Sequence, residues 1–260
     1  MRENKALTTL KAGGEVVTGW LAIPSSISAE LMAKQGFDAL TIDLQHGAID
    51  YSDMVPMLQA ISTTETTPMV RLPWNDPSII GRVLDAGAYG VICPMINTGA
   101  EARAFVRACR YTPDGERSAG PLRASLYAGS DYIKNANHTI ITMAMVESAE
   151  AYKNLDDILD TPGLDGIYVG PSDLAFSMGE SAGFDPRFPA VYDAIIDIAQ
   201  RTVAKGLIAG IHVGSVQYGQ EMRAAGYTFQ AYLSDFRMMQ WAASNALAAF
   251  RTGKPVPTAP

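Results

Sequence analysis

The chain has 260 residues, 48% of them hydrophobic and 18% charged, with a formal net charge of −7 at pH 7. This composition is typical of a globular protein, and the acidic balance without any Lys/Arg run argues against a nucleic-acid partner. No apolar run approaches the roughly 20 residues of a membrane span, no secretory leader is recognisable, and two cysteines do not make a disulfide framework, so we expect a cytoplasmic protein without a membrane partner.

Short apolar segments alternate along the chain with longer amphipathic ones. The predicted strands are 16–23, 38–45, 67–73, 90–95, 139–147, 166–170, 207–213 and 227–233. The predicted helices are 27–35, 51–62, 76–86, 99–109, 148–160, 187–205, 215–225 and 235–250. Glycines precede five of the strands, where a helix end favours a left-handed residue: Gly36, Gly87, Gly163, Gly206 and Gly226. Strict alternation predicts parallel strands joined by crossover helices.

Eight such units favour an α/β fold of the closed (β/α)8 TIM-barrel type, in a single domain over residues 1–260. An open doubly wound sheet is the alternative, but no G-x-G-x-x-G follows the first strand. The longest segment expected to be irregular is 110–138, and residues 251–260 are expected to form a flexible tail.

Polar residues recur where the predicted strands end, and in a barrel these ends meet at the active site. Glu147 continues the alternation of Met143 and Met145, so it is expected to point into the barrel mouth, and Asp173 ends the next strand. Two carboxylates without a neighbouring His or Cys suit Mg²⁺ or Mn²⁺, with waters and substrate oxygens completing the shell. A salt bridge for Glu147 and a helix cap for Asp173 are the structural alternatives.

The segment GPSDLAF (170–176) has the pattern of a helix start. Gly170 would cap it, and Pro171 lacks an N–H, so the amides of Ser172 and Asp173 remain free to bind an anion. A substrate carboxylate suits this turn better than a phosphate, which usually requires a richer glycine loop. A plain capped turn is the alternative.

Two further strand ends carry candidate catalytic groups. Arg71 interrupts the apolar strand MVRLP and could stabilise the negative charge of an enolate oxygen. His46 is the side chain best suited to move protons near neutral pH, and Asp43 is close enough in sequence to fix its tautomer. The alternatives are a structural Asp43–Arg71 bridge and a polar filler role for His46.

Several segments, in chain order, together resemble the HpcH/HpaI aldolases, the class II metal-dependent pyruvate-type aldolases: FDALTIDLQHG, VRLP, RVLDAGAYGVICPM, MVES and LDGIYVGPSDLAFSMG. The resemblance implies a (β/α)8 barrel whose last helix is exchanged between subunits, in a hexamer built as a trimer of dimers. It also implies cleavage of 4-hydroxy-2-oxo acids to pyruvate or hydroxypyruvate plus an aldehyde, or the reverse condensation, through a metal-bound enolate.

The same resemblance assigns roles to the candidates. Glu147 and Asp173 match the ligands of the divalent metal, which would be Mg²⁺, Mn²⁺ or Co²⁺. His46, oriented by Asp43, matches a general base acting through water, and Arg71 matches the residue that holds the keto or enolate oxygen. The amides near position 173 match the site of the substrate carboxylate.

Asp85 matches an acidic residue that reaches the neighbouring subunit's site, and Trp20 lies where relatives carry an aromatic pocket wall. The chain departs from the family at Gln45, usually Glu, and at Met145, often Gln. His212, at the end of the seventh strand, is a further polar residue that could meet the aldehyde or a hydroxylated donor, or be a structural histidine.

Three rival functions or mechanisms were weighed. A CoA-ester lyase of the citramalyl or malyl type needs a basic entrance, for which the arginines near the long segment are candidates: Arg103, Arg107, Arg110, Arg117 and Arg123. A non-catalytic barrel that binds a 2-oxo acid and metal is the rival from another class. A Schiff-base aldolase is disfavoured because no lysine falls at a predicted strand's carboxyl end.

Overall fold

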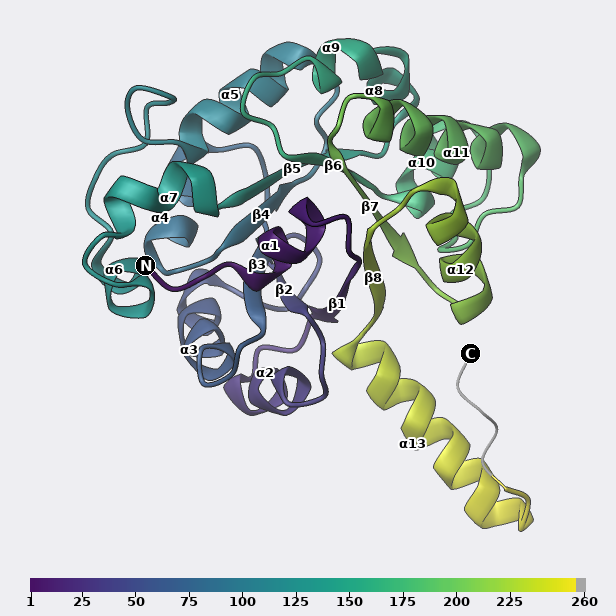
Figure 1. Ribbon diagram of the computed structural model, residues 1–260. Helices are drawn as coiled ribbons and strands as arrows, with labels where there is room; N and C mark the ends of the chain where they lie inside the picture. Colours follow the sequence, from purple (N-terminus) through teal and green to yellow (C-terminus); the bar gives the residue numbers. More distant parts are fainter. Residues whose placement is uncertain (256–260) are drawn as a thin grey trace.

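The computed structural model describes residues 1–255 and shows a closed barrel of parallel strands in chain order, with β8 pairing back onto β1 (Figure 1). The strands are β1 (Val16–Leu21), β2 (Ala39–Asp43), β3 (Thr67–Arg71), β4 (Gly90–Cys93), β5 (Ile141–Val146), β6 (Gly166–Val169), β7 (Ile208–Val213) and β8 (Phe229–Ser234). The (β/α)8 barrel predicted from the alternation is confirmed.

Helices surround the barrel and connect its strands. They are α1 (Lys5–Lys11), α2 (Ser26–Ala33), α3 (Tyr51–Ile61), α4 (Pro77–Asp85), α5 (Gly99–Cys109), α6 (Leu122–Ala128), α7 (Tyr132–Thr139), α8 (Ala149–Lys153), α9 (Leu155–Leu159), α10 (Pro171–Ser177), α11 (Pro189–Ala204), α12 (Val216–Ala225) and α13 (Asp235–Thr252).

Two helices lie where an irregular segment was expected. The prediction for 110–138 is wrong because α6 and α7 occupy its second half, divided at Gly129 with φ of +110°. Each has only seven or eight residues, too few for a helical period to stand out in the sequence. Buried Tyr132 anchors α7 against the rest of the fold.

The five glycines expected to end helices all have positive φ, between +71° and +113°. An L side chain is strained in this region, whereas glycine is not. Gly226 shows the arrangement most clearly: it caps α12 in the left-handed conformation, directly ahead of the segment that leads into β8. The helix ends predicted from these glycines are confirmed.

The core has two layers separated by the sheet. Outward-facing residues such as Leu40 and Ile42 pack against the helices, whereas Met69, Met143 and Met145 fill the barrel interior. Helix α1, which was not predicted, packs Ala6 and Leu7 onto the interior cluster. The alternation along β5 therefore directs the residue that follows it, at position 147, toward the barrel mouth.

The last helix, α13, extends away from the barrel (Figure 1). It runs for 18 residues, and Asp235 at its first position is its buried residue. The expected flexible tail began too early, since Arg251 and Thr252 are helical; its end, 256–260, lies outside the described residues. Within the described part, no helix combines the length and apolarity that a membrane crossing requires.

Candidate active site

A cavity of about 430 Å³ opens at the carboxyl ends of the strands. It gathers most of the residues predicted from the sequence: Trp20, Asp43, His46, Arg71, Gly170, Pro171, Ser172, Asp173 and His212. Glu147 lies directly behind it, against Gly170. Among the described residues no lysine lines the cavity, so a Schiff base has no candidate here.

Asp43 and Arg71 form a buried, two-point ion pair. Arg71 donates from Nε to Asp43 Oδ1 at 2.8 Å and from Nη2 to Oδ2 at 2.6 Å, and the Trp20 indole N–H donates to Oδ2 at 3.2 Å. Burial raises the pKa of Asp43, but the bonds and charge of Arg71, with the Trp20 bond, outweigh it and hold that pKa below its usual value. Asp43 is therefore a carboxylate with its orientation fixed from two sides.

His46 contacts Asp43 through its main chain. The peptide N–H groups of Gln45 and His46 donate to Asp43 Oδ1 at 3.0 and 3.2 Å. We expected the carboxylate to fix the imidazole tautomer; instead it fixes the loop, and in residues 1–255 no hydrogen bond joins it to the ring. The exposed imidazole remains at the cavity rim, free to meet a substrate.

Glu147 is a buried carboxylate without a cationic partner in the described chain. It is 3% exposed, and its Oε1 accepts a 2.7 Å bond from the amide of Met95, whose φ of +54° turns that N–H toward it. Burial, with the charge of Asp173, raises the pKa of Glu147 to about 7 despite the Met95 bond and Arg71. A bound cation stabilises the ionised form of such a buried, unpaired carboxylate.

The start of α10 forms the adjoining edge of the cavity. Gly170 caps the helix and Pro171 takes its first position, so the amides of Ser172 and Asp173 have no partner within the helix. A β-carbon on Gly170 would lie 2.7 Å from Glu147 Oε2, which only glycine avoids. Asp173 itself is exposed beside the cavity.

These residues fit a hard divalent cation. Glu147, which lies against Gly170, and Asp173, three residues further along the chain, supply carboxylate oxygen donors at the same edge of the cavity. No cluster of three or more His, Cys, Asp or Glu side chains occurs in the described residues, which suits an ion such as Mg²⁺ that keeps water and substrate oxygens in its shell. Glu147 and Asp173 are thus the two side chains here that could hold such an ion.

One wall of the cavity is a row of planar side chains. Arg71 lies over the Trp20 ring at 5.0 Å, Trp20 contacts His212 at 5.2 Å, His212 contacts Phe184 at 5.0 Å, and Arg237 lies over Phe184 at 4.3 Å. Phe184 and Arg237 were not predicted as site residues; Phe184 lies in a long loop and Arg237 on the first turn of α13.

His212 is held neutral within this wall. Burial and the charges of Arg71 and Arg237 lower the pKa of His212 to about 3, against a smaller opposing effect of Asp43. Its Nδ1 is 3.3 Å from the hydroxyl of Tyr168, a barrel-interior residue that the sequence reasoning did not single out, although its place in the strand GIYVG was a usable signal. The imidazole is therefore an uncharged polar group in an aromatic surround.

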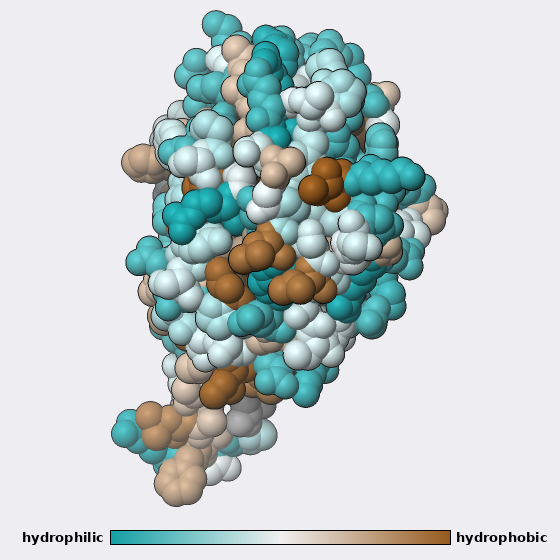
Figure 2. Space-filling view, turned by 90° about the vertical axis from the view of Figure 1, so that its left-hand side faces the viewer, coloured by the Kyte–Doolittle hydropathy of each residue, from teal (hydrophilic) through white to brown (hydrophobic). Residues whose placement is uncertain are grey.

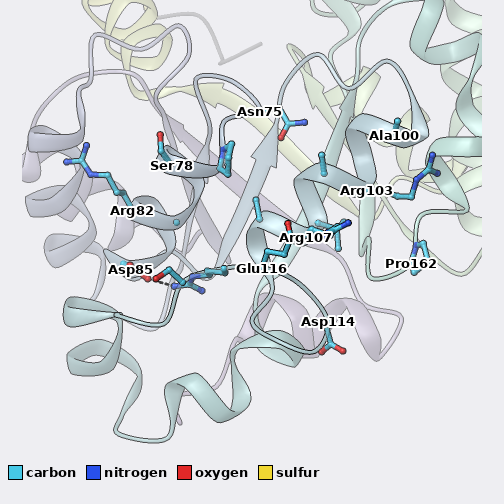
Figure 3. Close-up of a pocket in the computed structure, with 17 residues that line it drawn as sticks. Asn75, Ser78, Arg82, Asp85, Ala100, Arg103, Arg107, Asp114, Glu116 and Pro162 are labelled. Carbon is cyan, nitrogen blue, oxygen red and sulfur yellow. Dashed lines mark hydrogen bonds and ion pairs between the residues drawn. The ribbon is translucent and has the colours of Figure 1, made fainter.

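Asp85 does not reach this cavity within the chain. It ends α4 and pairs with Arg117 at 2.6 Å, beside a larger cavity of about 1120 Å³ between α4 and α5 (Figure 3). The arginines considered for a CoA entrance lie near the same region, away from the strand ends. Four are paired with acidic residues, Arg103 with Asp157, Arg107 with Glu116, Arg110 with Asp165 and Arg117 with Asp85. None lines the 430 Å³ cavity.

Known proteins resemble this chain over nearly its whole length. Residues 18–240 match the family described as HpcH/HpaI aldolase/citrate lyase. The chain is 41% identical over 248 residues to the hydroxypyruvate/pyruvate aldolase of Rhizorhabdus wittichii, covering 95% of this chain and 99% of that one. It is 39% identical over 244 residues to the 4-hydroxy-2-oxo-heptane-1,7-dioate aldolase of Klebsiella pneumoniae, covering 93% and 91%.

A solved structure of the same family has the same fold. The crystal structure of an HpcH/HpaI aldolase/citrate lyase family protein from Burkholderia cenocepacia matches with a TM-score of 0.87 at 31% identity, covering 94% of this chain and 99% of that one. The family match spans well over half of the chain, and the sequence relatives exceed 30% identity. The chain belongs to the HpcH/HpaI aldolase/citrate lyase family.

Proposed function

We propose that the protein is a carbon–carbon lyase that cleaves 4-hydroxy-2-oxo acids into pyruvate or hydroxypyruvate and an aldehyde, and catalyses the reverse condensation. The observation that carries this proposal is that one cavity brings together the Asp43–Arg71 ion pair and Asp173, with the buried carboxylate of Glu147 directly behind it. The names of the two aldolase relatives support the same reaction and both donors.

Glu147 and Asp173 would hold the metal, Mg²⁺, Mn²⁺ or Co²⁺, which supplies Lewis-acid polarisation of the keto group when bound. The free amides of Ser172 and Asp173 bind the substrate carboxylate beside it. Arg71, kept in place by Asp43, donates to the keto oxygen and stabilises the charge that develops there as an enolate.

His46 moves the proton. In the condensation direction it takes a proton, through water, from the carbon next to the keto group and returns it to the new 4-oxygen once the carbon–carbon bond has formed. In cleavage it accepts the proton of the 4-hydroxyl as that bond breaks and returns it, through water, to the enolate carbon, giving the free 2-oxo acid. Its exposed position at the rim and the loop geometry fixed by Asp43 support this role. The planar wall around Trp20 keeps bulk water away from the enolate.

The test is a cleavage assay with metal-depleted protein, added Mg²⁺, Mn²⁺ or Co²⁺, and a set of 4-hydroxy-2-oxo acids. Turnover that EDTA abolishes supports the proposal, and the donor-by-aldehyde profile identifies the substrates. Glu147→Ala is expected to lose metal binding and activity, whereas His46→Ala keeps metal binding and loses activity. An unchanged rate in His46→Ala contradicts the base assignment, and a borohydride-trapped adduct contradicts the metal mechanism.

We also propose a homo-oligomer, a hexamer formed as a trimer of dimers, in which α13 packs on a neighbouring subunit. Exposed apolar side chains along α13 support this: Phe236, Met239, Leu247 and Phe250. The side of the molecule that carries α6 and α7 shows a further apolar group within hydrophilic surroundings (Figure 2). On α6, Leu122 and Leu126 are more than four-fifths exposed. In this assembly Asp85 would reach the neighbour's cavity.

Light scattering after gel filtration tests the assembly. We expect a hexamer for the wild-type protein and dissociation for the double substitution Met239→Glu and Phe250→Glu, since a charge cannot be buried unpaired. A monomeric wild type contradicts the proposal. We further propose a single-domain, cytoplasmic protein, which the free, buried thiols of Cys93 and Cys109 support.

A further inference from the structure

The planar wall of the cavity ends in a guanidinium on each side, and the two ends differ in charge. At one end Arg71 is neutralised by its two bonds to Asp43. At the other end Arg237 is exposed and lies over Phe184, and no acidic partner for it occurs among residues 1–255. The outer end of the wall therefore carries a positive charge at the cavity that no acidic side chain in the described part of the same chain compensates.

Hydrogen bonds of neighbouring residues fix the position of Arg237 at the cavity. It lies in the first turn of α13, and the helix start is fixed because Asp235 accepts bonds from the amide of Ala22 at 2.8 Å and the hydroxyl of Ser28 at 3.0 Å. The ring beneath it is fixed as well. Asp185, next to Phe184, binds the amide of Gly214 at 2.7 Å.

A reacting molecule in this cavity has two ends. The metal-binding pair, Arg71 and the start of α10 account for the 2-oxo acid, as proposed above. The aldehyde must then extend from the reacting carbon along the remaining wall, past His212 toward Arg237. Since His212 is uncharged, the guanidinium of Arg237 is, among the described residues that line the cavity, the remaining cationic group able to recognise the far end of that aldehyde.

We propose that Arg237, stacked on Phe184, selects acceptor aldehydes that carry an anionic group, a carboxylate or a phosphate, at the end remote from the reacting carbon. This inference rests on the proposed aldolase function and adds the residue that determines acceptor specificity in its second half-site. A guanidinium presents a planar fork that matches both anions bidentately, and stacking on a ring restricts its motion before substrate arrives.

The test uses two matched pairs of acceptors with pyruvate and Mn²⁺ held constant. Succinic semialdehyde and butanal have equally long carbon chains, and only the first is charged; D-glyceraldehyde 3-phosphate and D-glyceraldehyde form the phosphate pair. We expect the wild-type protein to favour the anionic member of a pair. The pair that shows the preference identifies carboxylate or phosphate as the group recognised.

Arg237→Met is expected to lower kcat/KM for the preferred anionic acceptor about 10- to 100-fold, the value of a lost charged hydrogen bond, with the neutral acceptor and the KM for pyruvate unchanged within about threefold. Arg237→Lys keeps the charge but not the fork and should fall between. The matched control is Arg223→Met, which removes an exposed arginine of α12 outside this cavity.

An unchanged anionic-to-neutral ratio in Arg237→Met overturns the inference, and so does an equal loss on both acceptors, which would indicate a structural role. Turnover of butanal by the wild type tests the aldolase function independently of the proposed anion site. If no acceptor reacts, the aldolase proposal fails, and quenching of tryptophan fluorescence by succinate, a non-reacting analogue, still tests Arg237. A Kd for succinate about tenfold weaker in Arg237→Met supports the anion site, and an equal Kd overturns it.

Discussion

Asp43 and Arg71 are joined by two hydrogen bonds of 2.8 and 2.6 Å, and both side chains are less than a tenth exposed. Asp43→Ala leaves the guanidinium buried and uncompensated, which should lower the free energy of unfolding by about 3–5 kcal/mol. Replacing both, as Asp43→Leu with Arg71→Met, should recover much of that loss. Urea unfolding of the single and double variants measures both effects; a double variant as unstable as Asp43→Ala contradicts this account.

Gly170 has no room for a side chain, because its β-carbon would meet Glu147 Oε2 and the Met145 methyl group, each at 2.7 Å. Gly170→Ala should displace the Glu147 carboxylate and weaken Mn²⁺ binding about 10- to 100-fold, as supporting contacts to metal ligands do. Calorimetric titration measures the affinity. Gly81→Ala, where nothing lies within 4 Å, is the control. Equal Mn²⁺ affinity in the two variants would place the metal elsewhere.

His212 makes stability depend on pH. Burial lowers its pKa to about 3 in the folded protein, whereas the unfolded chain has the ordinary value near 6.5. Between these values the unfolded chain binds more protons, so stability falls as pH drops. The loss between pH 7 and 5 should be about 1–2 kcal/mol. His212→Phe keeps a ring in the wall and removes this contribution, so the difference in the free energy of unfolding between wild type and variant should change by about 1–2 kcal/mol between pH 7 and 5. The opposite contribution of Glu147, whose raised pKa favours the folded state as pH drops, is common to both proteins. Urea unfolding at both pH values measures the difference, and an unchanged difference contradicts this account.

Asp235 connects α13 to the loop after β1, through bonds from the Ala22 amide at 2.8 Å and the Ile23 amide at 3.4 Å, and to α2, through a bond from the Ser28 hydroxyl at 3.0 Å. Asp235→Ala leaves buried donors unsatisfied and should lower the free energy of unfolding by about 2–4 kcal/mol. Ser28→Ala removes one bond and should lose about 1 kcal/mol. Faster hydrogen exchange at Ala22 and Ile23 in Asp235→Ala alone would localise the effect, and equal exchange in both variants would refute it.

The barrel was predictable because its signals are local. Strand-length apolar runs recur eight times, and the glycines before five strands have the positive φ that their position required. Along β5 a period of two carries Met143, Met145 and then Glu147 to the mouth. Helices α6 and α7 were not predicted because each is too short for a helical period to be seen in the sequence. Helix α1 was not predicted because it lies before the first strand.

The site was only partly predictable. Residues at strand ends could be assigned to one cavity from the sequence, since parallel strands end at the same edge. The contact that Asp43 makes with the backbone of His46 could not, because spacing does not distinguish a peptide N–H from a ring nitrogen. Phe184 and Arg237 reach the cavity from a loop and from α13, where no strand register places them.

The hydrogen bonds of Asp235 connect α13 to the surroundings of a fluorescent side chain, Trp20. Ala22, which it binds, is two residues beyond Trp20, and Trp20 is 4% exposed at the centre of the cavity wall. A displacement of the start of α13, such as the proposed subunit contact would cause, is therefore expected to change the surroundings of a buried indole. Emission from Trp20, isolated by replacing Trp74 and Trp241 with phenylalanine, would report subunit association and filling of the cavity in the same spectrum.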